Sequence, residues 1–371
     1  MIGRRMYRLL LLVLVLSLGG ATGSSRAASE WSTVEIFSVD LAGRQTNLTH
    51  DPAWDVNPAV ARDGRIAFFT NRIGGGLDAM DANGGAVRLV TAGGGIEVAE
   101  DLEWSQASWA PRGDRLAFDG LYLANPDPGC SHYCAGWHLL TVAADGSGLT
   151  EIARNARAPA WSPDGRRIAY ENWTGPNDLG GPSGVTISSP DGSSAVKLTA
   201  FPLGDLRPVW SPRGGELAFG GVQRTAPRLG IYVVRADGTQ MRRLTRGGDP
   251  SWSPDGHRFA FIRDGRLFTI GSNGKGRRRL SRKGEFVVGQ AWAPKGHLIA
   301  YVEGKARNHG GCGVPGTIEV RDCVVPGSLR LKTVNANSGR VRVLMAERWT
   351  SFWGDPVWMP SAKRVLLTVQ L

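Results

Sequence analysis

The stretch Pro250–Phe261, which reads Pro-Ser-Trp-Ser-Pro-Asp-Gly and then runs into Phe-Ala-Phe, constrains the fold of this chain more than any other feature. The phrase recurs roughly every 40 to 65 residues, which is the signature of a repeat architecture. The other copies are Pro58–Phe69, Ala107–Phe118, Pro159–Tyr170, Pro208–Phe219, Gln290–Val302 and Pro356–Leu367. Repeat folds keep several hundred residues in one domain, so the 371-residue length does not require a division.

Each copy predicts a pair of antiparallel strands joined by a tight turn. Pro presets the backbone of a type I turn, Asp bonds nearby amides, and Gly accepts a positive φ. A strand with a large aromatic precedes the turn, and an apolar strand with Ala follows it. Two copies depart from this pattern, with Val60 in place of Trp and Leu366 in place of Ala. A small residue beside a repeated Trp predicts sheets that pack face to face, large against small.

A second hairpin alternates with the first, beginning with Val34–Thr49 and turning mostly on Asp-Gly, Asn-Gly or Ser-Gly. Its other copies are Leu77–Thr91, Leu139–Ile152, Val185–Thr199, Ile231–Thr245, Leu267–Ser281 and Leu329–Leu344. The two hairpins form a four-stranded unit a-b-c-d, with seven copies of each hairpin in the chain. Because the chain begins with an orphan c-d pair and ends with an orphan a-b pair, we expect these to complete one sheet. The prediction is an all-β, seven-bladed β-propeller closed by N-terminal c-d strands pairing with C-terminal a-b strands.

The clearest copies, Trp161–Tyr170 and Ile231–Gly256, resemble the WD40-like propeller repeat of the TolB type. The resemblance covers essentially everything after the N-terminal segment. It implies a propeller but says little about function, because such repeats occur in periplasmic binding and scaffolding proteins and in substrate-gating domains of peptidases. TolB itself pairs a six-bladed propeller with a separate N-terminal domain. The seven predicted blades leave no room for that domain, so the resemblance does not transfer TolB's partner to this chain.

The N-terminus predicts export. Arg4, Arg5 and Arg8 precede the apolar run Leu9–Leu18, and small residues follow it, as in a secretory signal peptide cleaved near Ala27. The run is too short to favour a spanning helix, although a retained anchor is the alternative. The expected domains are a signal peptide at 1–27 and a single propeller at 28–371. We therefore expect a periplasmic, cell-envelope or secreted protein without a stable membrane span after cleavage, and a mature chain that stays basic.

The four cysteines form two sequence-local pairs, Cys130 with Cys134 and Cys312 with Cys323. In an exported protein two local disulfides are the simplest interpretation. A zinc site built from all four thiolates is the alternative, and it would require two distant loops to meet.

Loop length distinguishes the two rims of the predicted ring. The a-b and c-d turns are short, and we call their side the turn rim. The b-c and d-a connections share the opposite side, the loop rim, and the long ones are Ala92–Gln106, Asp119–Trp137, Glu171–Gly184 and Glu303–Ser328. Long variable loops on a rigid scaffold commonly bind partners.

Polar and aromatic residues gather in these connections. The predicted binding residues are His50, Trp54, Asp55, Asp101, Trp104, Trp137, Trp173, Asp205, Trp349 and Trp353. The alternative for the aromatic residues is that they cap the loops as small satellite cores.

The sequence predicts an exported, non-enzymatic binding or scaffold propeller, a monomer that presents its loop rim to a protein or an envelope glycopolymer. The alternative is an enzyme of polysaccharide lyase-like or hydrolase type that uses loop-rim histidines and acids. His50, His132, His138 and His309 lie on that rim but are scattered, and no nucleophile elbow, zinc helix or phosphate loop occurs. We assign no catalytic residue, metal ligand or cofactor.

A basic run from Lys275 to Lys283 lies near Arg242, Arg243 and Arg246, on the outer strands of two neighbouring blades. No aromatic residues interleave it as base stacking would require, so we expect no nucleic-acid partner. Protection of the blade edges and docking of a polyanion remain the two interpretations.

Overall fold

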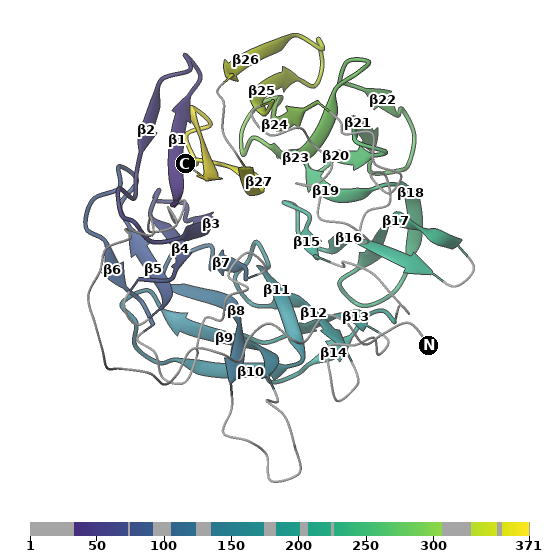
Figure 1. Cartoon of the computed structure of the whole chain (residues 1–371). Coiled ribbons are helices and arrows are strands. Elements are labelled where there is room, and N and C mark those ends of the chain that lie inside the picture. Colours follow the sequence, from purple (N-terminus) through teal and green to yellow (C-terminus); the bar gives the residue numbers. More distant parts are fainter. Residues whose placement is uncertain are drawn as a thin grey trace, which may run out of the picture. The chain divides into compact units, whose positions relative to one another are not determined.

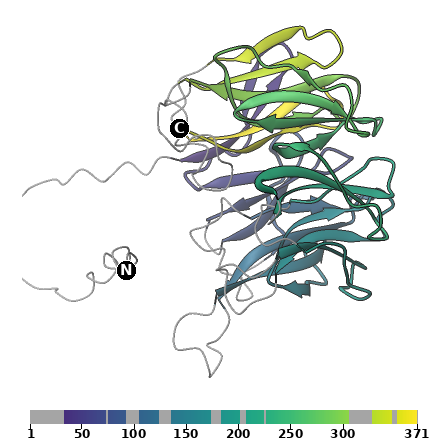
Figure 2. The same cartoon turned by 90° about the vertical axis from the view of Figure 1, so that its right-hand side faces the viewer.

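The computed structural model describes residues 33–72, 75–91, 105–123, 135–173, 183–200, 207–223, 226–305, 328–346 and 351–370. The chain divides after Ser32, and every described residue belongs to the unit Thr33–Leu371. All regular structure in the described ranges is β-strand, in seven four-stranded antiparallel sheets. Figure 1 shows these sheets as blades around a ring, and Figure 2 shows the ring from the side.

We number the blades along the chain and give the inner strand first. Blade 1 is β3 (Asp55–Val60), β4 (Ile66–Thr70), β5 (Gly76–Met80) and β6 (Arg88–Leu89). Blade 2 is β7 (Ala107–Trp109), β8 (Arg115–Leu123), β9 (Ala135–Ala143) and β10 (Thr150–Arg154). Blade 3 is β11 (Ala156–Trp161), β12 (Ile168–Trp173), β13 (Ser183–Ser188) and β14 (Val196–Lys197). Blade 4 is β15 (Val209–Trp210), β16 (Glu216–Gln223), β17 (Ala226–Arg235) and β18 (Arg242–Arg246).

The remaining blades complete the ring. Blade 5 is β19 (Gly248–Trp252), β20 (Arg258–Arg263), β21 (Arg266–Gly271) and β22 (Arg278–Arg279). Blade 6 is β23 (Phe286–Trp292), β24 (Leu298–Gly304), β25 (Arg330–Asn335) and β26 (Val341–Met345). Blade 7 is β27 (Ser351–Trp358), β28 (Arg364–Gln370), β1 (Val34–Asp40) and β2 (Gln45–Asn47).

Blade 7 joins the two ends of the described chain. β1 pairs with β28 along its whole length, from Val34 opposite Gln370 to Asp40 opposite Arg364. The sheet order is β2-β1-β28-β27, so the N-terminal c-d pair and the C-terminal a-b pair form one blade. Each inner strand contacts the inner strands of both neighbouring blades. The predicted seven-bladed closed ring is confirmed.

The Ser-Pro-Asp-Gly turns have the predicted chemistry. In blade 3, Ser162 donates its hydroxyl to Asp164 at 2.6 Å, and the Gly165 amide donates to the Ser162 carbonyl at 2.9 Å. Gly165 has a φ of +71°, a conformation that glycine adopts without steric penalty. This hydrogen-bonded turn fixes the register of the two strands that it joins, in which Trp161 pairs with Ile168.

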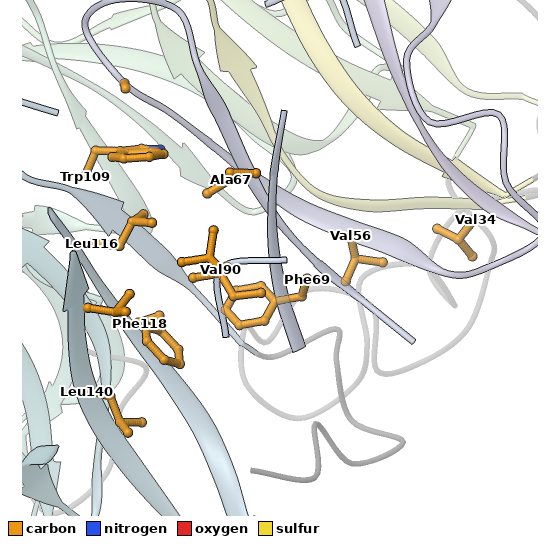
Figure 3. Close-up of a cluster of buried hydrophobic side chains, with 13 residues drawn as sticks. Val34, Val56, Ala67, Phe69, Val90, Trp109, Leu116, Phe118 and Leu140 are labelled. Atoms are coloured by element: carbon orange, nitrogen blue, oxygen red, sulfur yellow. The ribbon is translucent and has the colours of Figure 1, made fainter. Parts of the chain in front are cut away.

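The repeated Trp and Ala meet across blade boundaries. Each repeat Ala is buried and shares a hydrophobic cluster with the Trp of the next blade, beginning with Ala67 and Trp109. The same holds for the pairs Ala117–Trp161, Ala169–Trp210, Ala218–Trp252, Ala260–Trp292 and Ala300–Trp358. Figure 3 shows Ala67 of blade 1 beside Trp109 of blade 2. A buried Trp removes about 150–250 Å² from water, so these pairs stabilise the ring by several kcal/mol each.

The indole N–H groups bond the preceding blade at four boundaries. Each donates to the main-chain carbonyl of the residue just before the preceding blade's Trp, or before Val60 in blade 1. The donor and acceptor pairs are Trp109 to Ala59 (3.1 Å), Trp210 to Ala160 (2.9 Å), Trp252 to Val209 (3.2 Å) and Trp358 to Ala291 (3.0 Å).

At the other two Trp-containing boundaries the acceptor position is Ser108 or Ser251. There the serine hydroxyl accepts the main-chain N–H of Trp161 (3.2 Å) or Trp292 (2.9 Å). The indole N–H groups of these two residues have no described hydrogen-bond partner.

The two exceptions to the repeat lie opposite each other at the boundary between blades 7 and 1. Val60 packs against a buried cluster that contains Leu366 and Met359. Two larger residues accompany the loss of Trp. Leu366 stands at the repeat Ala position, and Met359 stands directly after the Trp position, where the other copies have Ser or Ala. Compensating volume changes are what a close-packed interior tolerates best.

Strands extend into several connections that the sequence assigns to loops, and the longest extension is in blade 2. The segment Asp119–Trp137 is expected to be a connection, yet β8 runs to Leu123 and β9 begins at Ala135. The two strands pair without interruption from Asp119 opposite Leu139 to Leu123 opposite Ala135.

Candidate functional site

The predicted binding residues fall into three groups according to what the structure describes. Side chains are described for His50, Trp54, Asp55, Trp137 and Trp173, and only the main chain is described for Trp353 in β27. Asp101, Trp104, Asp205 and Trp349 lie outside the described residues, as do Cys130, Cys134, Cys312 and Cys323 of the predicted disulfides. Within the described part of the loop rim, the polar side chains gather in blade 1 and at the start of the inner strands.

An acid-rich cluster lies at the loop rim of blade 1, and we call it the Arg72 cluster. Asp55, the fully buried first residue of β3, accepts a hydrogen bond from the Arg72 guanidinium at 2.8 Å. The same guanidinium lies 3.5 Å from the Asp51 carboxylate and 3.8 Å from that of Asp78 in β5. Arg72 also lies over the Phe68 ring, 5.5 Å from its centroid. One cation is therefore shared among three carboxylates.

Burial makes these carboxylates harder to ionise. Burial raises the pKa of Asp78 to about 6 against the opposing pull of Arg72, and the charges of Asp55 and Asp51 add to the rise. Burial likewise raises the pKa of Asp55. Glu35, on β1 of blade 7, has its pKa raised by burial and by the charge of Asp55. Asp55 of blade 1 and Glu35 of blade 7 therefore interact across the boundary between these blades.

His50 and Trp54 lie in the segment that leads into β3. His50 is exposed and adopts a φ of +45°. The Trp54 amide donates to the Asn71 side chain at 2.7 Å. Trp54 also forms an isolated parallel β-bridge with Val34 of β1. The Trp54 side chain is partly buried against the core cluster of blades 1 and 2. The segment is thus held to strands of two blades, with His50 left on the surface.

Trp137 and His138 are adjacent in β9 but are not displayed as a binding surface. The Trp137 side chain is buried. His138 contacts Glu151 of the outer strand β10 at 2.8 Å, and Arg154 contacts the same carboxylate at 2.8 Å. For Trp137 the packing interpretation agrees with the structure better than the binding interpretation, because a buried ring offers little surface to a partner.

Trp173 ends β12 beside an ion pair. The Arg157 guanidinium lies 5.8 Å from the Trp173 ring centroid and donates to Glu171 at 2.8 Å. Glu171 is buried, and Arg157 is about one-third exposed. A guanidinium held between a carboxylate and an aromatic face is preorganised, so a ligand at this place meets a rigid charged surface.

Asp119 is a fully buried carboxylate in β8. It accepts main-chain hydrogen bonds from Gln106 and from Ala158 of the next blade. Burial raises the pKa of Asp119 to about 7, although these bonds and the charges of Arg157 and Arg207 oppose the rise. Ala158 reaches this carboxylate because it adopts a φ of +56° at a bulge in β11. Asp119 therefore connects blades 2 and 3 rather than facing a ligand.

A second link between blades is formed around Gln290 in β23. The Gln290 side-chain amide donates to the Asp249 carbonyl at 2.7 Å, and its main-chain N–H donates to the Asp355 carboxylate at 3.2 Å. The Arg207 guanidinium, just before β15, lies 4.0 Å from that carboxylate. β15 and β27 are three blades apart in the ring, so Arg207 connects inner strands that are not neighbours.

The inner strands carry bulges at this end. Register shifts interrupt the pairing of β3, β11, β19, β23 and β27 with the second strand of each blade. Asn57 and Asp249 adopt φ values of +52° beside two of these shifts. A bulge changes the direction in which a side chain points. Here the Asn57 side-chain amide donates to the Ser105 carbonyl, just before blade 2, at 2.9 Å. We call Asn57, Arg157, Arg207, Gln290 and Asp355 the inner polar set.

Sequence reasoning selected Asp55 and Trp173 as candidates but did not select Arg72, Arg157, Asp119, Arg207 or Asp355. The available signal was position, since Arg157, Arg207 and Asp355 lie three or four residues before the repeat Trp of their own blades. That signal is weak because a bulge, which sequence rarely marks, decides where each side chain points.

The four loop-rim histidines are not brought together as far as the structure describes them. His50 is exposed before β3 and His138 is paired in blade 2, while His132 and His309 lie outside the described residues. Within the described ranges, no three His, Cys, Asp or Glu side chains have the arrangement of a metal site. Over the same ranges no helix is long and apolar enough to cross a bilayer.

Two arginines of the predicted basic patch bridge neighbouring blades. Arg242 of β18 donates to Glu216 at 3.0 Å and to the Ser272 carbonyl of blade 5 at 3.4 Å. Arg278 of β22 donates to the carbonyls of Ala336 and Asn337 in blade 6. These contacts favour the edge-protection interpretation of the patch, because the guanidinium donors are used within the ring.

A family described as the TolB beta propeller domain matches residues 132–312. A TolB homolog from Chlorobium luteolum is 35% identical over 135 residues, covering 33% of this chain and 28% of that protein. The uncharacterized protein Atu1656 from Agrobacterium fabrum is 25% identical over 227 residues, covering 55% of this chain and 68% of that protein. The chain thus spans less than a third of the length of the first relative.

Solved structures share the fold. A putative TolB from Agrobacterium tumefaciens has a TM-score of 0.54 at 15% identity, over 92% of this chain and 99% of that one. An oligogalacturonate lyase in complex with manganese has a TM-score of 0.57 at 14% identity, over 92% of this chain and 96% of that one. At such identities the likeness concerns the propeller alone, and both binding proteins and enzymes use it.

Proposed function

Because the chain is a propeller built of TolB-type repeats, we propose that it is an exported, non-enzymatic binding protein whose loop rim holds a segment of a partner protein in the cell envelope. The observation that carries this proposal is the inner polar set together with Trp173. It presents both signs of charge and an aromatic face at one end of the inner strands, held by bonds between blades and by the Arg157–Glu171 pair within blade 3.

Rigid display is the proposed mechanism. Ring closure fixes the inner strands relative to one another, so a bound segment does not have to order its site. The side chains of Arg157 and Asp355 are 32% and 40% exposed and offer one cation and one anion to a polar chain. The two predicted disulfides would stiffen the long loops of blades 2 and 6. A mixed-charge surface suits a protein segment better than a uniformly anionic glycopolymer, which would demand an excess of cations.

The test compares two exposed histidines on opposite rims. His50 lies on the loop rim, and His257 lies in the β19–β20 turn on the turn rim. Each is replaced in turn by a photo-crosslinking phenylalanine derivative in the full-length chain, and adducts formed in intact cells are identified by mass spectrometry. We expect a discrete protein adduct from position 50 and none of the same mass from position 257.

Other outcomes would decide against the proposal. Equal adducts from both positions would mean that contact is not confined to the loop rim. Carbohydrate adducts from position 50 would assign the rim to an envelope glycopolymer. Turnover of a polyuronate or a chromogenic peptide by the purified chain, lost in Arg157→Ala, would support the enzyme alternative instead.

A further inference from the structure

One blade boundary lacks the tryptophan that the other six contain. Val60 occupies the Trp position of blade 1, facing blade 7. At four other boundaries an apolar residue directly precedes the Trp position of one blade, and its carbonyl accepts the indole N–H of the next blade's Trp. Val357 has this position in blade 7, and its ladder partner Leu366 is in the same register as the repeat Ala elsewhere. No described side chain donates to the Val357 carbonyl.

An open hollow of about 310 Å³ lies at this place on the turn rim. Val60, Val357, Trp358, Trp292 and Pro294 contribute to its apolar lining, which blades 6, 7 and 1 share. Neither Leu366 nor Met359 lines it, because both are buried in the cluster behind Val60. The core at this boundary is therefore filled, and the hollow lies outside it.

The repeat also places a guanidinium beside the missing ring. At three boundaries the arginine that starts or precedes the second strand lies over the next blade's indole, as Arg167 lies 5.0 Å from Trp210. Arg65 over Trp109 and Arg258 over Trp292 are the other examples. Blade 7 has Arg364 at this position, exposed at the start of β28. No described aromatic ring lies under Arg364.

The surroundings of the hollow are positively charged. Arg62 is part of its lining, and Lys295 and Lys363 lie in the exposed turns of blades 6 and 7. Asp63, the one carboxylate in the a-b turns of blades 6, 7 and 1, is paired with Arg65 at 2.7 Å. No described carboxylate pairs with Arg62, so the hollow has an excess of cations that favours an acidic partner.

We propose that this hollow is a second binding site, which takes a tryptophan side chain from an acidic segment of a partner protein. The indole ring occupies the hollow between Val60 and Trp358, with its N–H donating to the Val357 carbonyl. The Arg364 guanidinium covers the ring, and acidic neighbours of the tryptophan approach Arg62. The repeat supplies the template, since the chain's own indoles donate to the equivalent carbonyl at four other boundaries, and two of these rings, Trp109 and Trp210, also lie under a guanidinium. The site stands on the turn rim and does not depend on the loop-rim function.

The probe is a fluorescein-labelled peptide, Asp-Glu-Trp-Asp-Glu, titrated with the full-length chain and followed by fluorescence anisotropy. We expect saturable binding that weakens at least tenfold when Ala replaces the peptide's Trp. A 1-methyl-tryptophan peptide, which cannot donate the N–H, should bind about fivefold more weakly, the effect of one hydrogen bond.

Two protein variants locate the site. Val60→Trp fills the hollow with the chain's own indole and should reduce peptide affinity at least tenfold. Arg62→Glu should also reduce it, and Arg213→Glu is the matched control, because Arg213 lies in the equivalent turn of blade 4. Arg62→Glu changes only a surface side chain, so it remains informative if Val60→Trp does not fold.

Three results would overturn the proposal. One is a folded Val60→Trp variant that binds the peptide like the wild type. Another is equal weakening by Arg62→Glu and Arg213→Glu, which would indicate diffuse attraction to the turn rim. The third is binding that does not distinguish Trp from Ala in the peptide.

Discussion

Six blade boundaries of this ring are built alike, and the boundary between blades 7 and 1 is not. At the six, a Trp packs on an Ala and both are buried. At the seventh, Val60 faces Leu366, an apolar hollow opens on the turn rim, and the Arg72 cluster with Glu35 lies at the loop rim. The seventh boundary is also where the chain's two ends are joined through β1 and β28.

The contrast between the six Trp-containing boundaries and the seventh shows which residues the repeat constrains. Where Trp and Ala must fit, both positions are fixed by close packing. Where Leu366 and Met359 supply the volume instead, the positions around Val60 no longer have to complete a core. Both ends of this boundary then carry side chains that the architecture does not require, namely the Arg72 cluster at the loop rim and the lining of the hollow at the turn rim.

The largest effect should come from removing the strands that close the ring. A chain ending at Gly354 lacks β28 and half of β27, so β1 loses its partner and the inner side of blade 7 is removed from between blades 6 and 1. We expect no cooperative thermal transition by circular dichroism. A truncated chain that melts cooperatively near the wild-type temperature would contradict the closed ring.

The two kinds of boundary should differ sharply on truncation to alanine. Trp210→Ala removes a buried ring, its hydrogen bond to Ala160 and its contact with Arg167, and should lower the free energy of unfolding by about 3–5 kcal/mol. Val60→Ala removes two methyl groups beside an open hollow and should lower it by about 1–2 kcal/mol. Urea denaturation of both variants measures the difference. Equal losses would mean that Val60 is packed as tightly as a repeat Trp.

The Arg72 cluster should make stability depend on pH. The folded-state pKa of Asp78, about 6, lies above its ordinary value of 3.8, so the folded protein holds this proton more tightly than the unfolded chain. The contribution of the protonated group is present below about pH 4 and is lost as the pH rises through 6. Asp78→Asn has no carboxyl to ionise at this position. The free energy of unfolding of the variant, relative to that of the wild type, should therefore rise by roughly 1–3 kcal/mol between pH 4 and 7. Urea titrations at several pH values check this, and a constant difference would contradict it.

The smallest effect concerns single hydrogen bonds at the regular boundaries. Trp358→Phe removes an indole that donates to the Ala291 carbonyl, whereas Trp161→Phe removes one with no described acceptor. Both changes lose similar ring volume, so the first should destabilise by about 1 kcal/mol more than the second. Equal midpoints and slopes in urea would show that the indole bonds add nothing to packing.

The sequence predicted the fold because its signals are local and repeated. Turn chemistry set each hairpin, the Trp and Ala positions set the packing, and the orphan hairpins at the two ends predicted closure. Val60 and Leu366 were visible as separate exceptions. Only ring closure brings them together, because the residues are some three hundred positions apart in the chain.

The candidate sites were less predictable because they depend on contacts between blades. The buried Asp119 carboxylate accepts a hydrogen bond from the Ala158 amide, which is in reach because Ala158 adopts a left-handed backbone conformation. Alanine rarely adopts this conformation, so the sequence gives no sign of it. Short turns made the turn rim look featureless, yet it holds the hollow. Trp137 was selected as a rim aromatic, and the structure buries it in β9.

The most direct test of the loop-rim binding account is hydrogen–deuterium exchange of the purified chain with and without the protein captured through position 50. The account predicts slower exchange in segments 50–57, 155–158 and 353–356, which lead into or form the inner strands at the loop rim. It predicts unchanged exchange in the β11–β12 and β15–β16 turns on the opposite rim. Protection confined to those turns, with the inner-strand segments unaffected, would contradict it.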